Sequence, residues 1–131
     1  DQVWLILPCS PLISKDDFIN AEQIYCAQKN KIKLMSVAKY PVPIEWAFKK
    51  NENGILKAVN VGAFEIPSQN IDPSFYDTGN FSIFSEKDII LSSGAGEGDN
   101  FIPFEIPFIR GLDIDDEEDW MNAEKIFSLS K

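Results

Sequence analysis

Apolar and polar positions follow one another along this chain in blocks that predict strands and helices in layers. The run from Val3 to Leu7 is apolar throughout, which predicts a buried central strand covered on both faces. Apolar residues at helical spacing continue from Ser14 to about Lys29. Asp17 stands three positions after Ser14, and this pair predicts a capping box at the helix start. A second strand is predicted at residues 33–40.

The rest of the chain continues the pattern after an irregular middle part. Two prolines in residues 41–46 exclude a central strand there and predict an edge or an excursion from the sheet. The same reading predicts a hairpin around Asn53-Gly54, a strand at 80–84, a short helix from Ser85 to Ile90, strand-like stretches at 101–107 and 111–114, and a closing helix from Asp116 to Leu129. Strands and helices in this order predict an α/β fold.

The charge balance excludes several classes of function. The 131 residues include 12 basic and 21 acidic ones, a net charge of -9, which argues against a nucleic-acid-binding protein because phosphate binding needs a basic surface. Histidine is absent, so Ser-His-Asp and Cys-His catalysis are excluded. Any metal is expected to be a hard cation held by carboxylates.

The cysteines and the apolar runs bear on the compartment. Cys9 and Cys26 have no metal-site or disulfide-scaffold spacing, and we expect both to be buried free thiols. No apolar stretch is long enough to span a bilayer, and residues 1–7 lack the basic start of a signal peptide. These features predict a cytoplasmic protein without a membrane partner. The chain opens with Asp1 just before an apolar strand, so we expect it to be part of a longer protein.

Two glycine-containing stretches are candidates for binding loops. Gly94 to Gly98 contains an acid and lacks the Gly-Lys-Ser/Thr ending of a phosphate loop, which favours an ordinary surface loop. In "YDTGNFSIF", residues 76 to 84, Asp77, Thr78 and Asn80 surround Gly79 where a strand begins. A glycine there permits a left-handed residue or the close approach of another group, although an ordinary turn before a strand fits as well.

The acidic run "GLDIDDEEDW", residues 111 to 120, divides into two parts. If residues 112–115 end a strand, Asp113 and Asp115 point to the same face, and two adjacent carboxylates repel unless a cation lies between them. Mg²⁺ suits such a pair, and the residues alone leave this reading level with a solvated acidic turn. The acids at 116–119 are explained by the helix start, whose free N–H groups favour negative charge.

Four stretches in their order along the chain resemble a known family. They are "LILPCSPLIS", "SVAKYPVPIEWAF", "PSQNIDPSFYDTGNF" and "GLDIDDEEDWMNAEKIF". This arrangement resembles the acylneuraminate (CMP-nonulosonic acid) cytidylyltransferases, most of all the branch that activates pseudaminic acid. The resemblance covers nearly the whole chain, and the last motif with its spacing to "YDTGNF" is the most specific part.

The resemblance implies a function, a fold and a set of site residues. The family transfers CMP from CTP to the anomeric hydroxyl of a nonulosonic acid and releases pyrophosphate. Its fold is the nucleotide-diphospho-sugar transferase type, Rossmann-like with three α/β/α layers, and it forms homodimers through an excursion that residues 37–69 resemble. The aspartates that match Asp113 and Asp115 bind Mg²⁺ and take part in catalysis. The positions that line the sugar side of the cleft match Ser10, Gln69, Asp77, Gly79 and Asn80.

The departures from the family pattern set the limits of this expectation. Family members carry an amino-terminal Gly- and Lys/Arg-rich segment that holds CTP, and nothing in this chain resembles it. We therefore expect a single domain that forms the carboxyl-terminal portion of such an enzyme and is inactive alone. Two alternatives stay open: a non-catalytic dimerisation or binding module derived from such an enzyme, and an enzyme that activates another acidic sugar such as 3-deoxy-manno-octulosonate.

Overall fold

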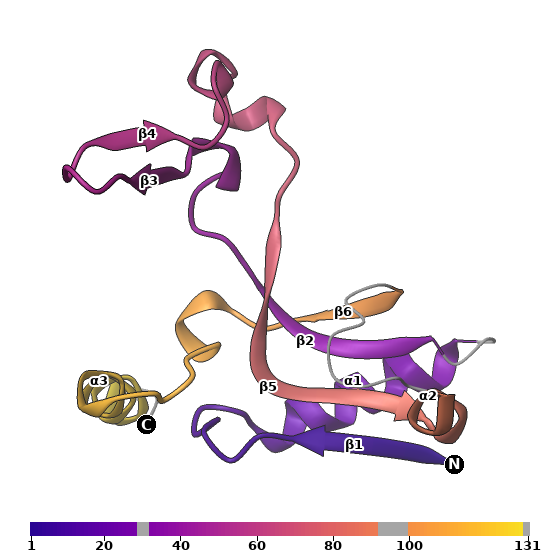
Figure 1. Ribbon diagram of the computed structural model, residues 1–131. Helices are drawn as coiled ribbons and strands as arrows, with labels where there is room; N and C mark the ends of the chain where they lie inside the picture. The colour runs from indigo at the N-terminus through magenta and orange to yellow at the C-terminus, as the bar shows by residue number, and fades with distance from the viewer. Residues whose placement is uncertain (29–31, 92–99, 130–131) are drawn as a thin grey trace. The chain divides into compact units, whose positions relative to one another are not determined.

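The computed structural model describes residues 1–28, 32–91 and 100–129 (Figure 1). The chain divides into two compact units: unit 1 comprises Asp1–Ala38 and Asp77–Lys131, and unit 2 comprises Lys39–Tyr76. The predicted dimerisation excursion at 37–69 falls largely within the range of unit 2, and its role in dimerisation stays a prediction. The predicted glycine-rich loop, Gly94 to Gly98, lies outside the described residues.

A four-stranded mixed sheet with helices forms the larger part of the fold, so the chain belongs to the α/β class. The order of its strands is β1-β5-β2-β6, with β1 and β5 antiparallel and β2 and β6 parallel. The elements are β1 (Gln2–Ile6), α1 (Lys15–Ala27), β2 (Lys33–Lys39), β5 (Phe75–Ser85), α2 (Glu86–Leu91), β6 (Phe101–Glu105) and α3 (Glu117–Leu129). Among the described residues, no helix has the length and apolar character needed to cross a membrane.

The core of unit 1 lies between the sheet and α1. Phe81 of β5 is at its centre, with ring centroids 5.6 Å from Trp4, 5.3 Å from Phe18 and 5.6 Å from Phe104. The buried members of this cluster are Ala21, Tyr25, Leu34, Phe81, Ile83, Phe104 and Ile106. Strands and helix are therefore held together by one continuous apolar cluster, with aromatic side chains from β1, α1, β5 and β6 in contact.

Several local predictions are confirmed by hydrogen bonds. The Ser14 side chain accepts a bond from the Asp17 N–H, and the Asp17 side chain accepts one from the Ser14 N–H, so the predicted capping box begins α1. The same reciprocal bonds join Ser85 and Asp88 at the start of α2. Each such cap stabilises its helix by about 1 kcal/mol. Its two residues are only three positions apart, so the helix start can be predicted from the local sequence.

Three predictions about unit 1 are wrong. Within the described residues β1 is an edge strand and not a central one, because β5 is its neighbour on one side only. Residues 111–114 form no strand. They belong to an irregular segment that follows a short 3-10 helix, η4 (Phe108–Arg110), and leads to α3. Cys9 and Cys26 are free as predicted, but Cys9 is half-buried and Cys26 is exposed.

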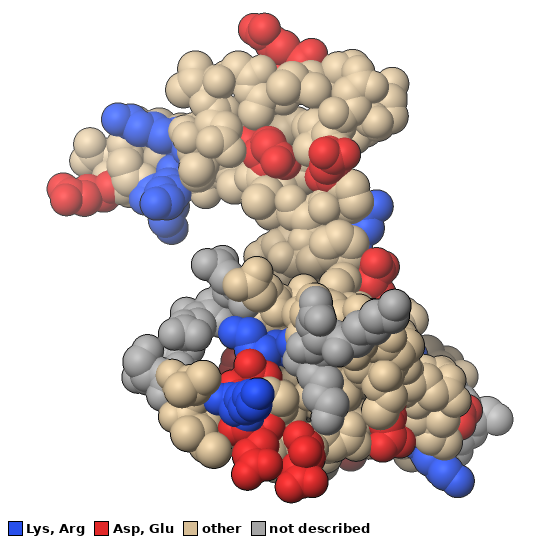
Figure 2. Space-filling view, turned by 90° about the vertical axis from the view of Figure 1, so that its right-hand side faces the viewer, with Lys and Arg blue, Asp and Glu red and all other residues tan. Residues whose placement is uncertain are grey.

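Unit 2 is a small hairpin with aromatic packing beside it. Strands β3 (Phe48–Lys50) and β4 (Leu56–Ala58) pair antiparallel around a turn in which Gly54 has φ +78°, as the Asn53-Gly54 sequence predicts. The Phe64 ring stacks on Trp46 and Phe48 at centroid distances of 6.0 and 5.1 Å. Uncharged residues cover most of the visible face of this unit in Figure 2, and many are large apolar side chains that lie exposed.

Candidate functional site

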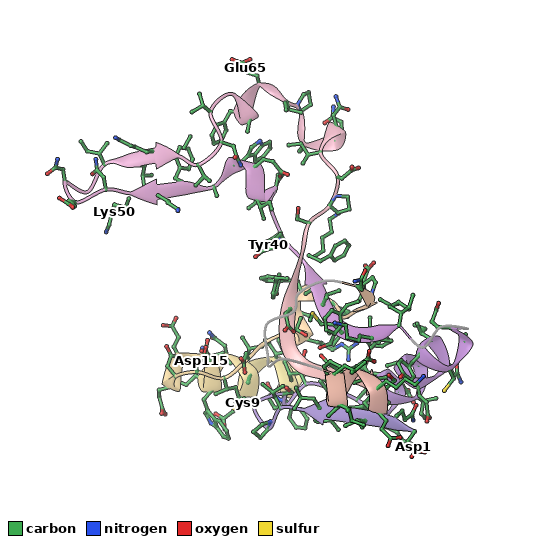
Figure 3. The ribbon with its side chains drawn as sticks, turned by 45° about the vertical axis from the view of Figure 1, so that its right-hand side comes forward. Asp1, Cys9, Tyr40, Lys50, Glu65 and Asp115 are labelled. Atoms are coloured by element: carbon green, nitrogen blue, oxygen red, sulfur yellow. The ribbon has the colours of Figure 1, made fainter. Side chains whose placement is uncertain are left out.

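The motifs "YDTGNF" (76–81) and "GLDID" (111–115) meet at one end of the unit 1 sheet, where Gly79 lies against Asp113. The turn after β1 and the segment before α3 lie at the same end of the unit, as the labels of Cys9 and Asp115 show in Figure 3, and Asp1 lies at the opposite end. The Leu7 N–H donates to the Asn80 carbonyl at 3.1 Å, which places the turn that carries Ser10 beside β5. The chain thus brings the first and last parts of its predicted site together.

Gly79 lies against the carboxylate of Asp113. Its φ of +67° is a left-handed conformation, and a Cβ added there would lie 3.4 Å from Asp113 Oδ2. The Gly79 N–H donates to Asp77 Oδ1 at 2.8 Å, which fixes this kink within β5. Both readings of Gly79 have support. The left-handed backbone and the Asp77 bond are those of a turn, and a carboxylate from 34 positions later in the chain lies in van der Waals contact with the glycine.

Asn80 and Ser10 carry buried polar side-chain atoms that have no hydrogen-bond partner among the residues that the structure describes. The Asn80 side chain is 1% exposed, and neither its amide nitrogen nor its amide oxygen makes a hydrogen bond. The Ser10 hydroxyl is also buried and unpaired. Because burying an unpaired polar group costs about 1–3 kcal/mol, such atoms usually bond to an ordered water or a ligand. Both residues are in the predicted set, so they are the members best suited to bind something polar.

The residues beneath this site form a fully bonded buried network. Thr78 Oγ1 donates to the Ser36 carbonyl at 3.1 Å and lies 2.9 Å from Ser36 Oγ, which in turn accepts from the Phe81 N–H at 3.0 Å. Gly111 packs directly on this network, since a Cβ there would lie only 2.8 Å from Thr78 Cγ2. The network holds β2, β5 and the start of the Asp113 segment in register. No local pattern indicates this network, because the bonded residues are 42 and 45 positions apart along the chain.

An ion pair between Arg110 and Asp17 was also not foreseen from the sequence. Arg110 donates to both carboxylate oxygens of Asp17, at 2.6 and 3.0 Å, and also to the Leu12 carbonyl at 3.5 Å. Burial raises the pKa of Asp17, but the hydrogen bonds from Arg110 and Ser14 outweigh this effect and lower it below the ordinary value. The ion pair joins the first turn of α1 to η4, and the bond to Leu12 joins the turn after β1 to η4, which directly precedes the Asp113 segment.

The structural part of the acidic run is confirmed at Asp116 and Asp119, while metal binding by Asp113 and Asp115 stays a prediction. Asp116 Oδ1 accepts from the N–H groups of Glu118 and Asp119, at 2.9 and 3.0 Å, and therefore caps α3. Asp119 Oδ2 accepts from the N–H groups of Asp115 and Asp116. Since no strand is present at 112–115, the argument that alternation directs Asp113 and Asp115 to one face does not apply. Asp113 is half-buried next to Gly79, whereas Asp115 is exposed.

Gln69 is the one predicted site residue outside unit 1. It lies in a short 3-10 helix of unit 2, η3 (Ser68–Asn70), and its side chain is exposed. The structure therefore groups Ser10, Asp77, Gly79, Asn80 and Asp113 within unit 1, with Asp115 next along the chain. Gln69 belongs to the other unit, and its part in the site stays a prediction.

The carboxylates near Gly79 limit which metal ion the site could hold. Within the described part of the chain, no group of three or more Asp, Glu, His or Cys side chains gathers in a metal-binding cluster. A zinc or calcium cage built from protein ligands alone does not fit these residues. Mg²⁺ needs fewer protein ligands, because it commonly takes one or two carboxylates and completes its octahedron with water and substrate oxygens, and its binding by Asp113 and Asp115 stays a prediction.

The chain was compared with known proteins by its sequence. A scan against protein-family models gives no match, and a search of curated proteins gives none either.

Proposed function

We propose that this chain is the carboxyl-terminal portion of an enzyme that transfers CMP from CTP to a nonulosonic acid, of which pseudaminic acid is the best candidate. One observation carries the proposal: the two most specific motifs, "YDTGNF" and "GLDID", come together with the Asp113 carboxylate packed on Gly79. Asn80, the residue after Gly79, has a buried side-chain amide without a hydrogen-bond partner among the described residues. The finer fold assignment, a nucleotide-diphospho-sugar transferase fold, is part of the same proposal.

The chemistry of the site residues suits this reaction. Asp113 and Asp115 would hold Mg²⁺, which neutralises the triphosphate when it is bound there. The Asn80 amide can donate and accept hydrogen bonds, and the Ser10 hydroxyl can do the same, so both can bind the hydroxyl and carboxylate groups of an acidic sugar. A chain of net charge -9 that handles anionic substrates needs a cation as intermediary, which agrees with the proposed ion.

The metal part of the proposal is tested by titrating the ¹⁵N-labelled chain with Mn²⁺, a paramagnetic substitute for Mg²⁺. We expect the amide signals of Gly79 and Asp113 to broaden first, and excess Mg²⁺ to restore them. Asp113→Asn should abolish this effect, while Glu124→Gln, which removes an exposed carboxylate of α3, should leave it unchanged. Equal broadening in Asp113→Asn, or a maximum far from Gly79, would contradict the assignment.

The sugar part is tested by adding N-acetylneuraminic or pseudaminic acid in the presence of Mg²⁺. The expected result is a set of shifts at Ser10 and Asn80 that Asn80→Ala removes and that a neutral hexose does not produce. Incubation of the same mixture with CTP should release no pyrophosphate, because the segment that holds CTP has no counterpart among these residues. Measurable pyrophosphate release would disprove that last expectation without affecting the binding result.

The dimerisation module remains the second candidate function, and unit 2 provides the observation that favours it. Val61, Phe64 and Phe48 expose large apolar surface on a unit with little core of its own. Exposed apolar patches of this kind mark interaction sites on many proteins. If Phe64→Ser and Val61→Ser together change the association state while Mn²⁺ binding is absent in every variant, the module reading is preferred to the enzyme.

A further inference from the structure

Two glycines from distant parts of the chain lie where the segment after η4 passes β5. A Cβ added at Gly111 would lie 2.8 Å from Cγ2 of Thr78, and one added at Gly79 would lie 3.4 Å from Oδ2 of Asp113. Thr78 and Gly79 are consecutive in β5, and Gly111 and Asp113 belong to one irregular segment. The two contacts are therefore reciprocal, because each segment places a side chain on the glycine of the other.

The Thr78 side of this contact is fixed. Thr78 is buried, and its Oγ1 hydroxyl donates to the Ser36 carbonyl at 3.1 Å and lies 2.9 Å from Ser36 Oγ. Because χ1 of a threonine positions Oγ1 and Cγ2 together, the methyl group cannot rotate away from Gly111 without breaking these bonds. The strand is also held on both sides, since β5 lies between β1 and β2. A side chain at position 111 would therefore displace the segment and not the strand.

The segment is held on its other side at Arg110, which bonds to both carboxylate oxygens of Asp17. Gly111 has φ -82° and ψ 32°, a conformation that other residues also adopt, so its backbone does not require a glycine. Among the described residues, no backbone hydrogen bond joins residues 112–114 to β5. The absence of a Cβ at Gly111 is therefore what brings the Asp113 carboxylate close to the strand.

We propose that Gly111 is a positioning residue, which sets the place of the Asp113 carboxylate on Gly79 by packing on the Thr78 methyl group. An atom added at position 111 has to be accommodated by a shift of residues 112 and 113, because Arg110 and Thr78 are both fixed. The consequence for metal binding rests on the proposed function. If Asp113 holds Mg²⁺, Gly111 affects the affinity without touching the ion, as groups that orient a metal ligand commonly do.

The first test measures the contact itself, by NOE spectroscopy on the labelled 131-residue chain without metal. The parent chain should show cross-peaks between the Thr78 methyl group and the Gly111 Hα protons, and between Gly79 Hα and Asp113 Hβ. Gly111→Ala should remove or strongly weaken the Gly79–Asp113 cross-peak. A cross-peak of unchanged intensity in this variant overturns the proposal, because the new Cβ is then accommodated elsewhere.

The second test asks whether space made at Thr78 restores the contact. Thr78→Ser removes Cγ2 but keeps the hydroxyl that bonds to Ser36, so the Gly79–Asp113 cross-peak should return in Thr78→Ser/Gly111→Ala. Thr78→Val keeps a methyl group in that place, and Thr78→Val/Gly111→Ala should lack the cross-peak. Equal behaviour of the two double variants overturns the proposal, also where Gly111→Ala alone does not fold.

The third measurement is a Mn²⁺ titration of the same variants. The affinity should fall about tenfold or more in Gly111→Ala and recover in Thr78→Ser/Gly111→Ala. A parent chain that does not bind Mn²⁺ contradicts the metal part of the proposed function, while the NOE results still decide the position of Asp113. If the parent chain binds Mn²⁺ and Gly111→Ala loses the contact but keeps the affinity, the effect of Gly111 on the metal is disproved.

Discussion

Two polar clusters in unit 1 differ in how fully their groups are bonded. In the first, the Asp17 carboxylate receives hydrogen bonds from Arg110 and from Ser14, and each of its oxygens has a partner. In the second, Asn80 is buried and its side chain makes no hydrogen bond among the described residues, while the Asp113 carboxylate lies against the preceding residue, Gly79. We refer to them as the Asp17 cluster and the Asn80 cluster.

The contrast separates a structural role from a binding role. A buried polar group with all its bonds made contributes to stability, whereas one left unpaired lowers it by the free energy of its lost hydration. A fold can retain such a group when something outside the protein chain bonds to it. Changes to the Asp17 side chain or its partners should therefore affect stability, and changes to the Asn80 side chain should affect binding with little loss of stability.

The largest expected effect comes from Arg110→Ala. It leaves the Asp17 carboxylate buried with only its Ser14 bonds, so we expect the free energy of unfolding to fall by about 2–3 kcal/mol. Urea denaturation measures this change. Lys125→Ala, on the exposed side of α3, is the matched control and should change stability by less than about 0.5 kcal/mol. If Arg110→Ala is as stable as the control, the ion pair is not structural.

The same ion pair predicts a pH dependence of a definite sign. Because the pKa of Asp17 is lower in the folded chain than its ordinary value of 3.8, its contribution to stability is present above that value. It is lost as the pH falls through the lower, folded pKa. The stability difference between the parent chain and Arg110→Ala should thus be constant near neutral pH and shrink in acid. Denaturation curves at a series of pH values measure it, and a difference that grows in acid would contradict the assignment.

The sequence was informative where the decisive contacts are local. Ser14 and Asp17, or Ser85 and Asp88, are three residues apart, so their caps and helix starts were predicted correctly. Arg110 pairs with a residue 93 positions earlier, and nothing in the local pattern indicated it. The edge position of β1 was mispredicted for the same reason. An apolar run indicates a strand, but which strands pair with it depends on residues far away in the sequence.

Gly79→Ala is expected to have the next largest effect within the Asn80 cluster. An L-residue at φ +67° costs about 1–2 kcal/mol, and the new Cβ would touch Asp113 Oδ2. We therefore expect both a loss of stability of that size and a weaker affinity for Mn²⁺. Gly54→Ala provides the control, because it has a similar φ of +78° with no neighbour within 4 Å. Equal Mn²⁺ binding in both variants would separate Gly79 from the metal site.

Two neighbouring residues of the acidic run, Asp115 and Asp116, should differ in what their replacement changes, with smaller effects than those above. Asp116→Ala removes the cap of α3 and should lower stability by about 1 kcal/mol. Asp115→Ala removes an exposed carboxylate for which we predict metal binding, so it should reduce Mn²⁺ affinity and leave stability nearly unchanged. Thermal denaturation and Mn²⁺ titration of both variants decide this. A reversal of the two outcomes would mean that the acids were assigned to the wrong roles.

The capping part of the acidic run was predicted correctly, but the surroundings of Asp113 were not. The helix start at Asp116 follows from local capping rules, which need only the nearest residues. The predicted strand at 111–114 failed because Gly111 is held against Thr78 and because α3 begins soon afterwards. The approach of Asp113 to Gly79 depends on both constraints. A pattern of acids along the chain can indicate a candidate ligand such as Asp113, but its contacts depend on how distant segments pack against it.

The smallest expected effect is also the most direct test of the contrast. Asn80→Leu replaces an unpaired buried amide with an apolar side chain of similar size, so stability should stay the same or rise by about 0.5–1 kcal/mol. Thr78→Val, two positions earlier, is equally conservative in shape but removes a hydroxyl that bonds to Ser36, and it should lower stability by about 1 kcal/mol. Chemical denaturation of the two variants gives both numbers. If Asn80→Leu is destabilised as much as Thr78→Val, the Asn80 amide bonds to ordered water as part of the fold. The binding role would then pass to Ser10 and Asp113.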